Sequence, residues 1–472
     1  MAKRRLYATI TGMAAILAML AAGCGSSSNG GSGSAGSSTT GSAAPDSGGS
    51  GATQPGTSAA GGDSGAPTTV KIINWVNPPA NDALKKINSQ FEAKYPNIKV
   101  DYQLAANTTG SYATMLQTTV TSHSADIITT NFPFQPLPNN PTRDNMTPEQ
   151  FWATSGLLEP LTDQPWIKNY TKDALASETY NGQIYGVLTG VYQWMVFYDK
   201  AVFAKYNLTA PRTYTDFVKV LDTLKQNGVT PLWLGTGGGA DGYVQQFLTE
   251  PLMASIWLPK VQGGNLAKAL ETGAEKWDSP NFVDVMTKEA KIGSYLEPGY
   301  TGVSWQGMPG AFAAGKAAML LDGSWDLASV QQANPKMDVG SFPLPGSDDP
   351  SLNKSLLSND LTFEVLKDAP HKDAALKYLE FFSQPEIYQE YVNMTGISPS
   401  QNGGTYDSFA AKVLGDTFGK GTSTDIVFPV LSAKQGFYCQ PANFPEVQVD
   451  VIAGKSSPAD AAKKYQGSCT TS

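Results

Sequence analysis

Histidine is almost absent from this chain, which has only two, His123 and His371, among 472 residues. No Cys/His spacing typical of a metal site is present, and a Ser-His-Asp enzyme is disfavoured for the same reason. The 41 Asp and Glu residues leave a carboxylate enzyme as an alternative. The net charge is −8 and no basic run follows the first few residues, so we expect no nucleic acid partner. We also expect no metal and no cofactor.

A phosphate-binding loop is lacking as well. Residues 235–242 are rich in glycine and follow an expected strand, but they have neither the Lys-Ser/Thr pair of a P-loop nor the GxGxxG spacing. We therefore do not predict nucleotide binding. We expect instead that this loop lets a ligand approach the backbone, with Tyr243 at the start of the next helix.

The N-terminus predicts export. Lys3, Arg4 and Arg5 precede an apolar segment at residues 6–20, which is too short to favour a resident membrane helix. The segment ends in LAAGC, which resembles the bacterial lipobox, so we expect residues 1–23 to be a signal peptide and Cys24 to carry a lipid. An ordinary cleaved signal with a chance cysteine is the alternative. A lipid on Cys24 would hold the protein at the membrane, outside the cytoplasm.

Residues 24–69 are expected to form a tether after this anchor. Residues 25–69 are almost wholly Gly, Ser, Ala and Thr, with Asp46 and Asp63 as their only charges. Such a composition cannot bury apolar surface and predicts disorder. Two cysteines remain, Cys439 and Cys469, and outside the cytoplasm two leftover thiols most often pair. We expect a disulfide between them that fastens the C-terminal tail.

Residues 70–130 predict an alternating series of strands and helices. Strands are expected at residues 70–75, 98–102 and 125–130, and amphipathic helices at 82–95 and 111–123. This order calls for a parallel sheet covered by helices.

Ligands of such sheets lie at the carboxyl ends of the strands. Trp75 follows the first strand, and Asn131 and Phe132 follow the third, so we expect these side chains on one rim. Turn chemistry for the asparagine and core packing for the rings are the alternatives.

Residues 185–200, YGVLTGVYQWMVFYDK, combine two kinds of pattern. Their apolar, Val-rich and aromatic composition suits a strand buried on both faces. Their centre, residues 189–194, also contains Gly190, Tyr192 and Gln193, for which a core strand has no use. We predict that this segment leaves one packed unit, crosses a ligand-bearing gap and enters another. A core strand with an irregular centre is the alternative.

The chain resembles the extracellular solute-binding proteins of carbohydrate ABC transporters, the maltose-binding-protein-like group. The resemblance covers residue 70 to the C-terminus and rests on the order and spacing of several segments. The most specific is AFAAGKAAMLLDGSW. The segments are residues 91–102, 125–128, 182–203, 213–217, 311–325 and 372–392.

The resemblance implies an α/β fold, a two-lobed periplasmic-binding-protein-like fold with three interlobe crossings. The crossings are expected near residues 186–193, 346–358 and 396–400. The N-terminal lobe would be residues 70–188 plus 358–395, and the C-terminal lobe residues 191–355 plus 401–472. The protein would be a monomer.

The resemblance also implies which side chains face the cleft between the lobes. Tyr192 occupies a cleft position on the first crossing, Trp325 matches a stacking tryptophan, and Tyr243 falls near a further aromatic. Another aromatic near the C-terminus is expected from Phe437, Tyr438 or Phe444, although Cys439 among them departs from the family pattern.

A sugar cleft needs rings for the apolar face of a pyranose and polar groups for its hydroxyls. Polar candidates near the crossings or beside Trp325 are Asp322, Asn359 and Asp360, in addition to Gln193; a turn or cap role is the alternative for Asp322, and core packing for Trp325.

The function predicted from the sequence is a lipid-anchored receptor on the outer face of the cell membrane of a Gram-positive bacterium. It would capture a sugar or oligosaccharide by hinge closure and deliver it to an ABC transporter permease. A tethered glycoside hydrolase with two carboxylates and an adhesive surface lipoprotein are the alternatives. A peptide, polyol or polyamine is the alternative ligand.

Overall fold

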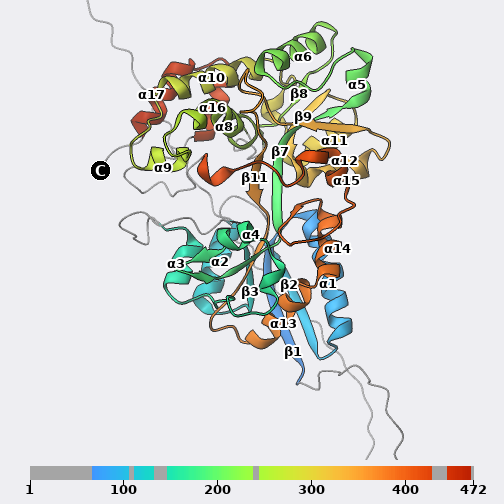
Figure 1. Cartoon of the computed structure of the whole chain (residues 1–472). Coiled ribbons are helices and arrows are strands. Elements are labelled where there is room, and N and C mark those ends of the chain that lie inside the picture. The colour runs from blue at the N-terminus through green and yellow to red at the C-terminus, as the bar shows by residue number, and fades with distance from the viewer. Residues whose placement is uncertain (1–65, 106–110, 132–145, 238–243, 428–443, 469–472) are drawn as a thin grey trace, which may run out of the picture. The chain divides into compact units, whose positions relative to one another are not determined.

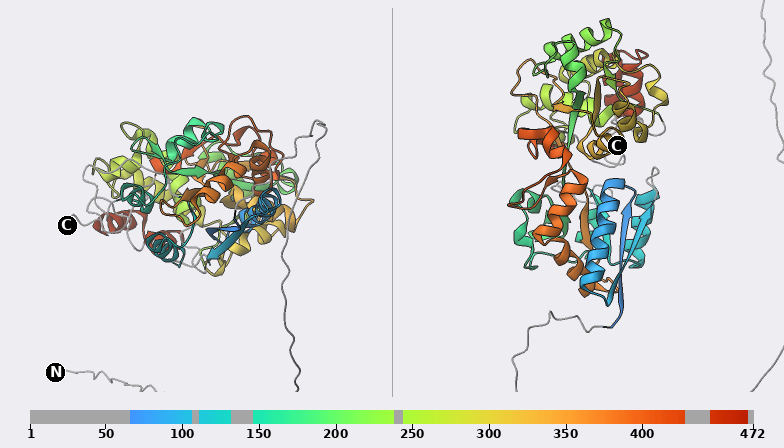
Figure 2. Two further views of the ribbon diagram at one scale, coloured as in Figure 1. Left: turned by 90° about the horizontal axis from the view of Figure 1, so that it is seen from below. Right: turned by 90° about the vertical axis from the view of Figure 1, so that its right-hand side faces the viewer.

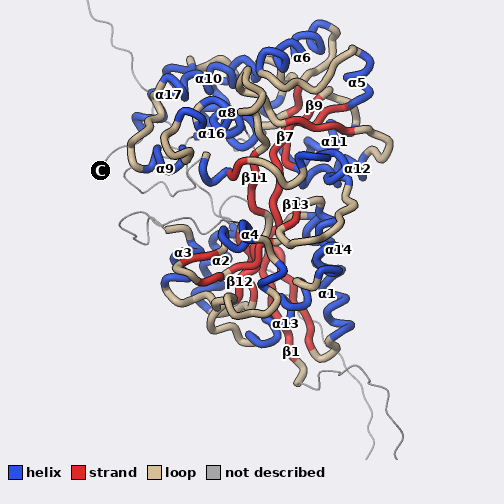
Figure 3. The backbone as a smooth tube through the Cα atoms, in the orientation of Figure 1, coloured by secondary structure: helices blue, strands red, loops and turns tan. Residues whose placement is uncertain are grey.

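The computed structural model describes residues 66–105, 111–131, 146–237, 244–427 and 444–468, all within a unit that extends from Gly61 to Ser472. Two β-sheets, each flanked by helices, organise these residues (Figure 1; Figure 3). Phe132, Tyr243 and the three cysteines lie outside the described residues. The expected lipid and disulfide therefore remain predictions.

The first sheet has five strands, and its first three follow the predicted order. The strand order is β2 (Ile98–Ala105), β1 (Thr68–Trp75), β3 (Ile127–Thr130), β12 (Thr362–Val365) and β6 (Gly186–Leu188). β1 pairs in parallel with β2 and β3, while β12 is antiparallel to both β3 and β6. The parallel arrangement predicted from the strand–helix alternation is thus confirmed for β1, β2 and β3.

Helices from two distant parts of the sequence cover the first sheet. The helices of this lobe are α1 (Pro78–Lys94), α2 (Ser111–Ser122), α3 (Pro148–Thr154), α4 (Lys172–Ser177), α13 (Lys372–Phe382) and α14 (Pro385–Thr395), with the turn η1 (Ile167–Asn169) and the hairpin β4 (Thr179–Tyr180) and β5 (Gln183–Ile184). α1 and α14 pack side by side (Figure 2). α1 begins at Pro78, where the fixed φ of proline suits a first turn, and it buries Leu84, Ile87 and Phe91. Phe91 meets Tyr378 and Phe381 of α13 edge-on, at 5.2 and 5.5 Å.

The second sheet is built around one long strand, β7 (Gly190–Asp199). The strands pairing directly with it are β9 (Met319–Gly323), β10 (Val339–Phe342), β11 (Leu356–Asn359) and β13 (Ser398–Pro399), all antiparallel; β8 (Leu232–Trp233) and β14 (Thr422–Ser423) complete the sheet. β7 reads GVYQWMVFYD, and its Met195, Val196 and Phe197 are buried. A strand with partners on both edges and both faces covered needs this apolar composition.

Helices cover the second sheet as well. They are α5 (Lys200–Lys205), α6 (Tyr214–Gln226), α8 (Glu250–Ile256), α9 (Leu266–Glu271), α10 (Pro280–Gly293), α11 (Met308–Ala313), α12 (Leu327–Ala333), α15 (Phe409–Leu414), α16 (Phe444–Ile452) and α17 (Pro458–Ser468). Short turns connect them, namely η2 (Gln245–Thr249), η3 (Leu258–Lys260), η4 (Tyr300–Gly302), η5 (Trp305–Gly307), η6 (Ser324–Asp326), η7 (Gly415–Thr417) and η8 (Thr424–Ile426). α6 illustrates the local logic: Thr213 caps its first turn by accepting from the backbone of Asp216, and Phe217, Leu221 and Leu224 form its buried face.

The chain passes between the sheets three times, at places that differ partly from expectation. The first passage is Thr189 alone, since β6 ends at Leu188 and β7 begins at Gly190. Thr189 lies within residues 186–193, where this crossing was expected. The second passage lies at residues 360–361, because β11 pairs with β7 as far as Asn359; it comes after the expected residues 346–358. The third runs from α14, which ends at Thr395, to β13, which begins at Ser398.

Gly190 is needed at the first passage. Its φ is +156°, and a Cβ there would lie 2.5 Å from the carbonyl oxygen of Ser398 and 2.7 Å from Cδ1 of Ile397. The close approach of β13 to β7 thus depends on a residue without a side chain.

Candidate functional site

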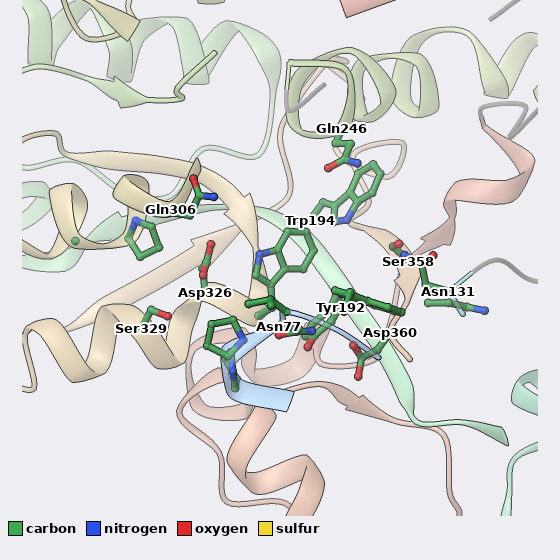
Figure 4. A pocket seen from close by; sticks show the side chains of 18 of the residues that line it. Asn77, Asn131, Tyr192, Trp194, Gln246, Gln306, Asp326, Ser329, Ser358 and Asp360 are labelled. Carbon is green, nitrogen blue, oxygen red and sulfur yellow. The ribbon is translucent and has the colours of Figure 1, made fainter. Parts of the chain in front are cut away.

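A pocket of about 550 Å³ is lined by residues from both lobes and by Asp360 of the second passage (Figure 4). Its volume is within the range of small-molecule sites, roughly 300–1,000 Å³. Four aromatic rings and a larger number of amide, hydroxyl and carboxyl groups line it. The lining residues with polar or aromatic side chains are Trp75, Asn77, Asn131, Tyr192, Trp194, Gln246, Gln306, Trp325, Asp326, Ser329, Ser358, Asn359 and Asp360.

The first lobe supplies Trp75, Asn77 and Asn131, which follow the carboxyl ends of β1 and β3. Trp75 packs edge-on against Tyr112 at 5.3 Å. Behind this rim the Asn81 side chain accepts from the Asn77 backbone N–H and donates to the Trp75 carbonyl. These bonds fix the turn before α1.

A buried polar network continues behind the same turn. Both Asn74 and Asn81 donate to the Tyr102 hydroxyl at 2.8 Å, and Thr129 donates to Asn74. Burial raises the pKa of Tyr102 to about 12. The network is therefore neutral at physiological pH, and it holds the rim without adding charge.

Tyr192 and Trp194 form the part of the pocket that comes from β7. They are two residues apart and so lie on one face of the strand. Both are largely buried, at 5% and 6% exposure, and both line the pocket. Sequence reasoning missed Trp194, although the alternation of a strand through Tyr192 would have identified it.

Gln193 points to the opposite face of β7 and does not line the pocket. Its side-chain nitrogen donates to the carbonyl oxygens of Thr417 and Lys420, at 2.7 and 3.2 Å. Its side-chain oxygen accepts from the Gly419 N–H and the Ser398 hydroxyl. We therefore leave Gln193 out of the proposed ligand contacts and assign it to the bracing of the passages.

The wall from the second lobe is formed by η6 and α12, where Trp325, Asp326, Ser329 and Ala333 line the pocket. The Trp325 ring lies edge-on to Tyr192, with 5.1 Å between centroids. A side chain at Gly323 would collide with the Trp325 ring. The glycine of the GSW segment is thus what allows the tryptophan to fold back over its own strand.

A π-helical turn, η2, places Gln246 in the same wall. Its next residue, Phe247, packs on both Trp194 and Trp325, with centroids 5.8 Å apart in each case. Turns of this kind occur frequently at functional sites. Neither Gln246 nor Gln306 of η5 was predicted, because no sequence signal distinguishes them from surface residues.

Two carboxyl groups face the pocket. Burial raises the pKa of Asp326 to about 6. Burial also raises the pKa of Asp360 to about 6, although hydrogen bonds from Thr189 and Tyr391 act to lower it. The Tyr192 pKa is raised well above its ordinary value by burial and then by the charge of Asp360.

Asp322 lies behind the wall rather than in it. It is fully buried and accepts a hydrogen bond from the Gly323 N–H at 2.7 Å. Burial and the charge of Asp326 raise the pKa of Asp322 well above the ordinary value. We therefore leave Asp322 out of the proposed contacts.

The structure thus brings together six of the residues expected from the sequence, namely Trp75, Asn131, Tyr192, Trp325, Asn359 and Asp360. The side chain of Phe444 lies outside the described part of the chain, as do Phe132 and Tyr243. Within the described residues there is no group of three or more metal-ligating side chains. The same residues contain no helix with the length and apolarity that a membrane span requires.

A ring-lined pocket between two α/β lobes joined by three passages defines the periplasmic-binding-protein-like class. The chain belongs to the bacterial extracellular solute-binding protein family, whose profile matches residues 76–389.

Known relatives and solved structures agree with this assignment. The multiple sugar-binding protein of Streptococcus mutans is 25% identical over 324 residues, which are 66% of this chain and 70% of that protein. RafE in complex with raffinose aligns with a TM-score of 0.66 at 19% identity, covering 85% of this chain and 100% of that chain. A sugar transporter from Bacillus licheniformis in complex with stachyose aligns with a TM-score of 0.64 at 18% identity, covering 84% and 98%. At these identities the structural matches establish the fold.

Proposed function

We propose that the protein is the substrate-binding component of an ABC importer and that it captures a sugar or oligosaccharide between its lobes. The observation that carries this proposal is the pocket itself, in which Trp75, Tyr192, Trp194 and Trp325 gather beside amide and carboxyl groups. Rings cover the C–H face of a pyranose, and amides and carboxylates take its hydroxyls. Membership of the solute-binding family and the name of the Streptococcus mutans relative support the same ligand class.

Hinge closure is the proposed mechanism. The three passages are short, and the pocket draws its lining from both sides of them. A ligand that contacts both lobes stabilises the arrangement in which they are close, and a permease that recognises this arrangement accepts only loaded protein.

We also propose a place in the cell. An extracellular location follows from the family. A lipid on Cys24 and a tether over residues 25–69 would keep a monomeric receptor on the outer face of a Gram-positive membrane, close to its permease.

A thermal-shift screen followed by calorimetry tests the sugar assignment. The mature chain carrying Cys24→Ser, which removes the lipidation site, is mixed with mono- and oligosaccharides, polyols, polyamines and short peptides. Ligand binding stabilises the folded state by RT ln(1 + [L]/Kd), so a sugar should raise the melting temperature. A response to a peptide, polyol or polyamine alone would overturn the sugar assignment and keep the binding role.

Glycoside hydrolases also use two carboxyl groups in one site, so hydrolysis is the second candidate function. We propose that no bond is broken, because relatives of the chain are binding proteins. Incubation with oligosaccharides and chromatographic analysis for products tests this point. Release of shorter sugars that stops in the Asp326→Asn variant would assign an enzyme instead.

A further inference from the structure

We infer that the pocket selects its ligand by charge: it accepts neutral sugars and rejects sugars that carry a carboxylate or another anionic group. This inference rests on the proposed function and adds a ligand class to it. It follows from the carboxyl groups that a ligand in the pocket must face.

Asp326 and Asp360 are both more than nine-tenths buried, with 8% and 2% exposure, and both line the pocket. The Oδ2 atom of Asp326 and the Oδ1 atom of Asp360 have no hydrogen-bond partner among the described residues. In Figure 4 the two groups lie apart, with Tyr192 between them. A ligand that fills the pocket therefore meets two separate carboxyl groups, each with an unpaired oxygen.

The surrounding groups do not neutralise these carboxyls. The other oxygen of Asp360 accepts from the hydroxyls of Thr189 and Tyr391, at 2.8 and 3.0 Å, and neither hydroxyl brings a positive charge. Asp326 has a second carboxyl, Asp322, behind it. Among the lining residues that the structure describes, none is Lys, Arg or His.

A further carboxyl group lies behind the pocket, next to Asn359. The lining amide of Asn359 donates to the Glu178 carboxyl at 3.4 Å, and Thr362 donates to the same oxygen at 3.2 Å. An anionic ligand group would lose its hydration here and meet charge of its own sign at low dielectric.

A neutral sugar satisfies the same groups. A hydroxyl both donates and accepts hydrogen bonds, so it can donate to the free oxygens of Asp326 and Asp360. The buried indole N–H of Trp194 also lacks a partner among the described residues and is a donor that a sugar oxygen can accept from. A carboxylate lacks the proton needed to donate to Asp326 or Asp360.

Calorimetry with matched ligand pairs tests the inference. Maltotriose, cellotriose and raffinose are each compared with a derivative in which one terminal hydroxymethyl group is oxidised to a carboxylate, at pH 7.5. We expect every neutral sugar that binds to do so at least tenfold more tightly than its acidic counterpart. Equal or tighter binding of the acid would overturn the charge selection while leaving the proposed function in place. Failure of all six to bind, in a protein that binds a non-sugar solute, would overturn both.

Two variants separate local charge from net charge. The measured quantity is the ratio of the Kd of the acidic sugar to the Kd of its neutral counterpart. Asp326→Asn should lower this ratio at least threefold. Asp338→Asn makes the same change in net charge at an exposed position of the same lobe, where the side chain is 72% exposed and pairs with Lys200, and it should leave the ratio unchanged. Asp360→Asn reports on the second carboxyl if Asp326→Asn does not fold. An unchanged ratio in a folded variant at either pocket position would overturn the role of that residue.

Discussion

Replacing Gln193 should destabilise the protein more than any loss of pocket lining. Its side chain is fully buried on the face of β7 that points away from the ligand. The side-chain oxygen accepts from Gly419 N–H at 2.8 Å and from Ser398, and the nitrogen has Thr417 O, Lys420 O and Ser355 Oγ within 2.7–3.2 Å. One amide thus connects three segments that meet near the passages between the lobes.

The expected loss of unfolding free energy follows from this geometry. An amide nitrogen has two hydrogens, so about four of these contacts can be strong hydrogen bonds at once. Each contributes about 1 kcal/mol net, and a buried partner left unpaired costs about 1–3 kcal/mol. Gln193→Leu has similar volume but removes these bonds and leaves the buried Ser398 hydroxyl without its acceptor, whereas the exposed Gly419 N–H and the half-buried Thr417 carbonyl can bond to water. We expect it to lose about 3–5 kcal/mol of unfolding free energy.

Gln193→Glu adds a signature that depends on pH. The new carboxyl group keeps an acceptor for the Gly419 N–H, but its second oxygen faces the Thr417 carbonyl oxygen. The folded state therefore favours the protonated carboxyl, and its pKa rises above the unfolded value of about 4.3. A group with a raised pKa in the folded state binds more protons there, so stability falls as pH rises through that interval.

Urea unfolding monitored by tryptophan fluorescence at pH 5 and pH 7.5 measures both effects. The leucine variant should lose the same amount at each pH, whereas the glutamate variant should lose more at pH 7.5. Gln226→Leu, at an exposed helix end, is the matched control and should change stability by less than about 0.5 kcal/mol. A leucine variant within 1 kcal/mol of the wild type would refute the reasoning about the bracing role.

Three further predictions concern other parts of the fold. Trp325→Ala should weaken sugar binding at least tenfold in calorimetry, with partial recovery in Trp325→Phe; wild-type affinity of the alanine variant would contradict a stacking role. Gly190→Ala should lower the melting temperature because the new Cβ would collide with the Ser398 carbonyl. Gly302→Ala is the control and should not lower it, because a Cβ at Gly302 would have nothing within 4 Å. Equal melting temperatures of the two variants would contradict the argument from close approach. Burial raises the pKa of Glu289 from about 4.5 to about 8, so the free energy of unfolding should fall as pH rises across this interval. Glu289→Gln should make this fall smaller when urea unfolding is measured at pH 5 and pH 8. An unchanged fall would show that Glu289 does not titrate this way.

The sequence predicted much of the first lobe because it depends on local patterns, whereas the two-lobed fold class was expected from the resemblance to the solute-binding family. The alternation of strands and helices before Asn131 fixes the parallel sheet. The sequence could place the first passage only within a range, because a strand that changes lobes and a strand that ends a lobe have the same composition. Only the pairing of Gly190 and Val191 with β13 and β11 distinguishes them.

The pocket was predicted in part for a related reason. Trp75 and Asn131 lie at strand ends, where a rule exists for ligand sites, whereas Trp325 was expected from the resemblance to the solute-binding family. Gln246 and Gln306 reach the pocket from short turns whose direction depends on tertiary packing, so no local pattern reveals them. Asp326 was missed in favour of Asp322 because the sequence does not show which of two acids flanking a tryptophan turns outward.

The alternation along β7 has a consequence for how such a receptor can change. Tyr192 and Trp194 line the pocket on one face, and Gln193 bonds to the connecting segments on the other. In the proposed receptor, ligand affinity and hinge movement therefore depend on alternating residues of β7, which lie on opposite faces of the strand. A new specificity can be engineered at Tyr192 and Trp194 while the moving parts keep their geometry, which makes this strand a natural starting point for building a sugar biosensor.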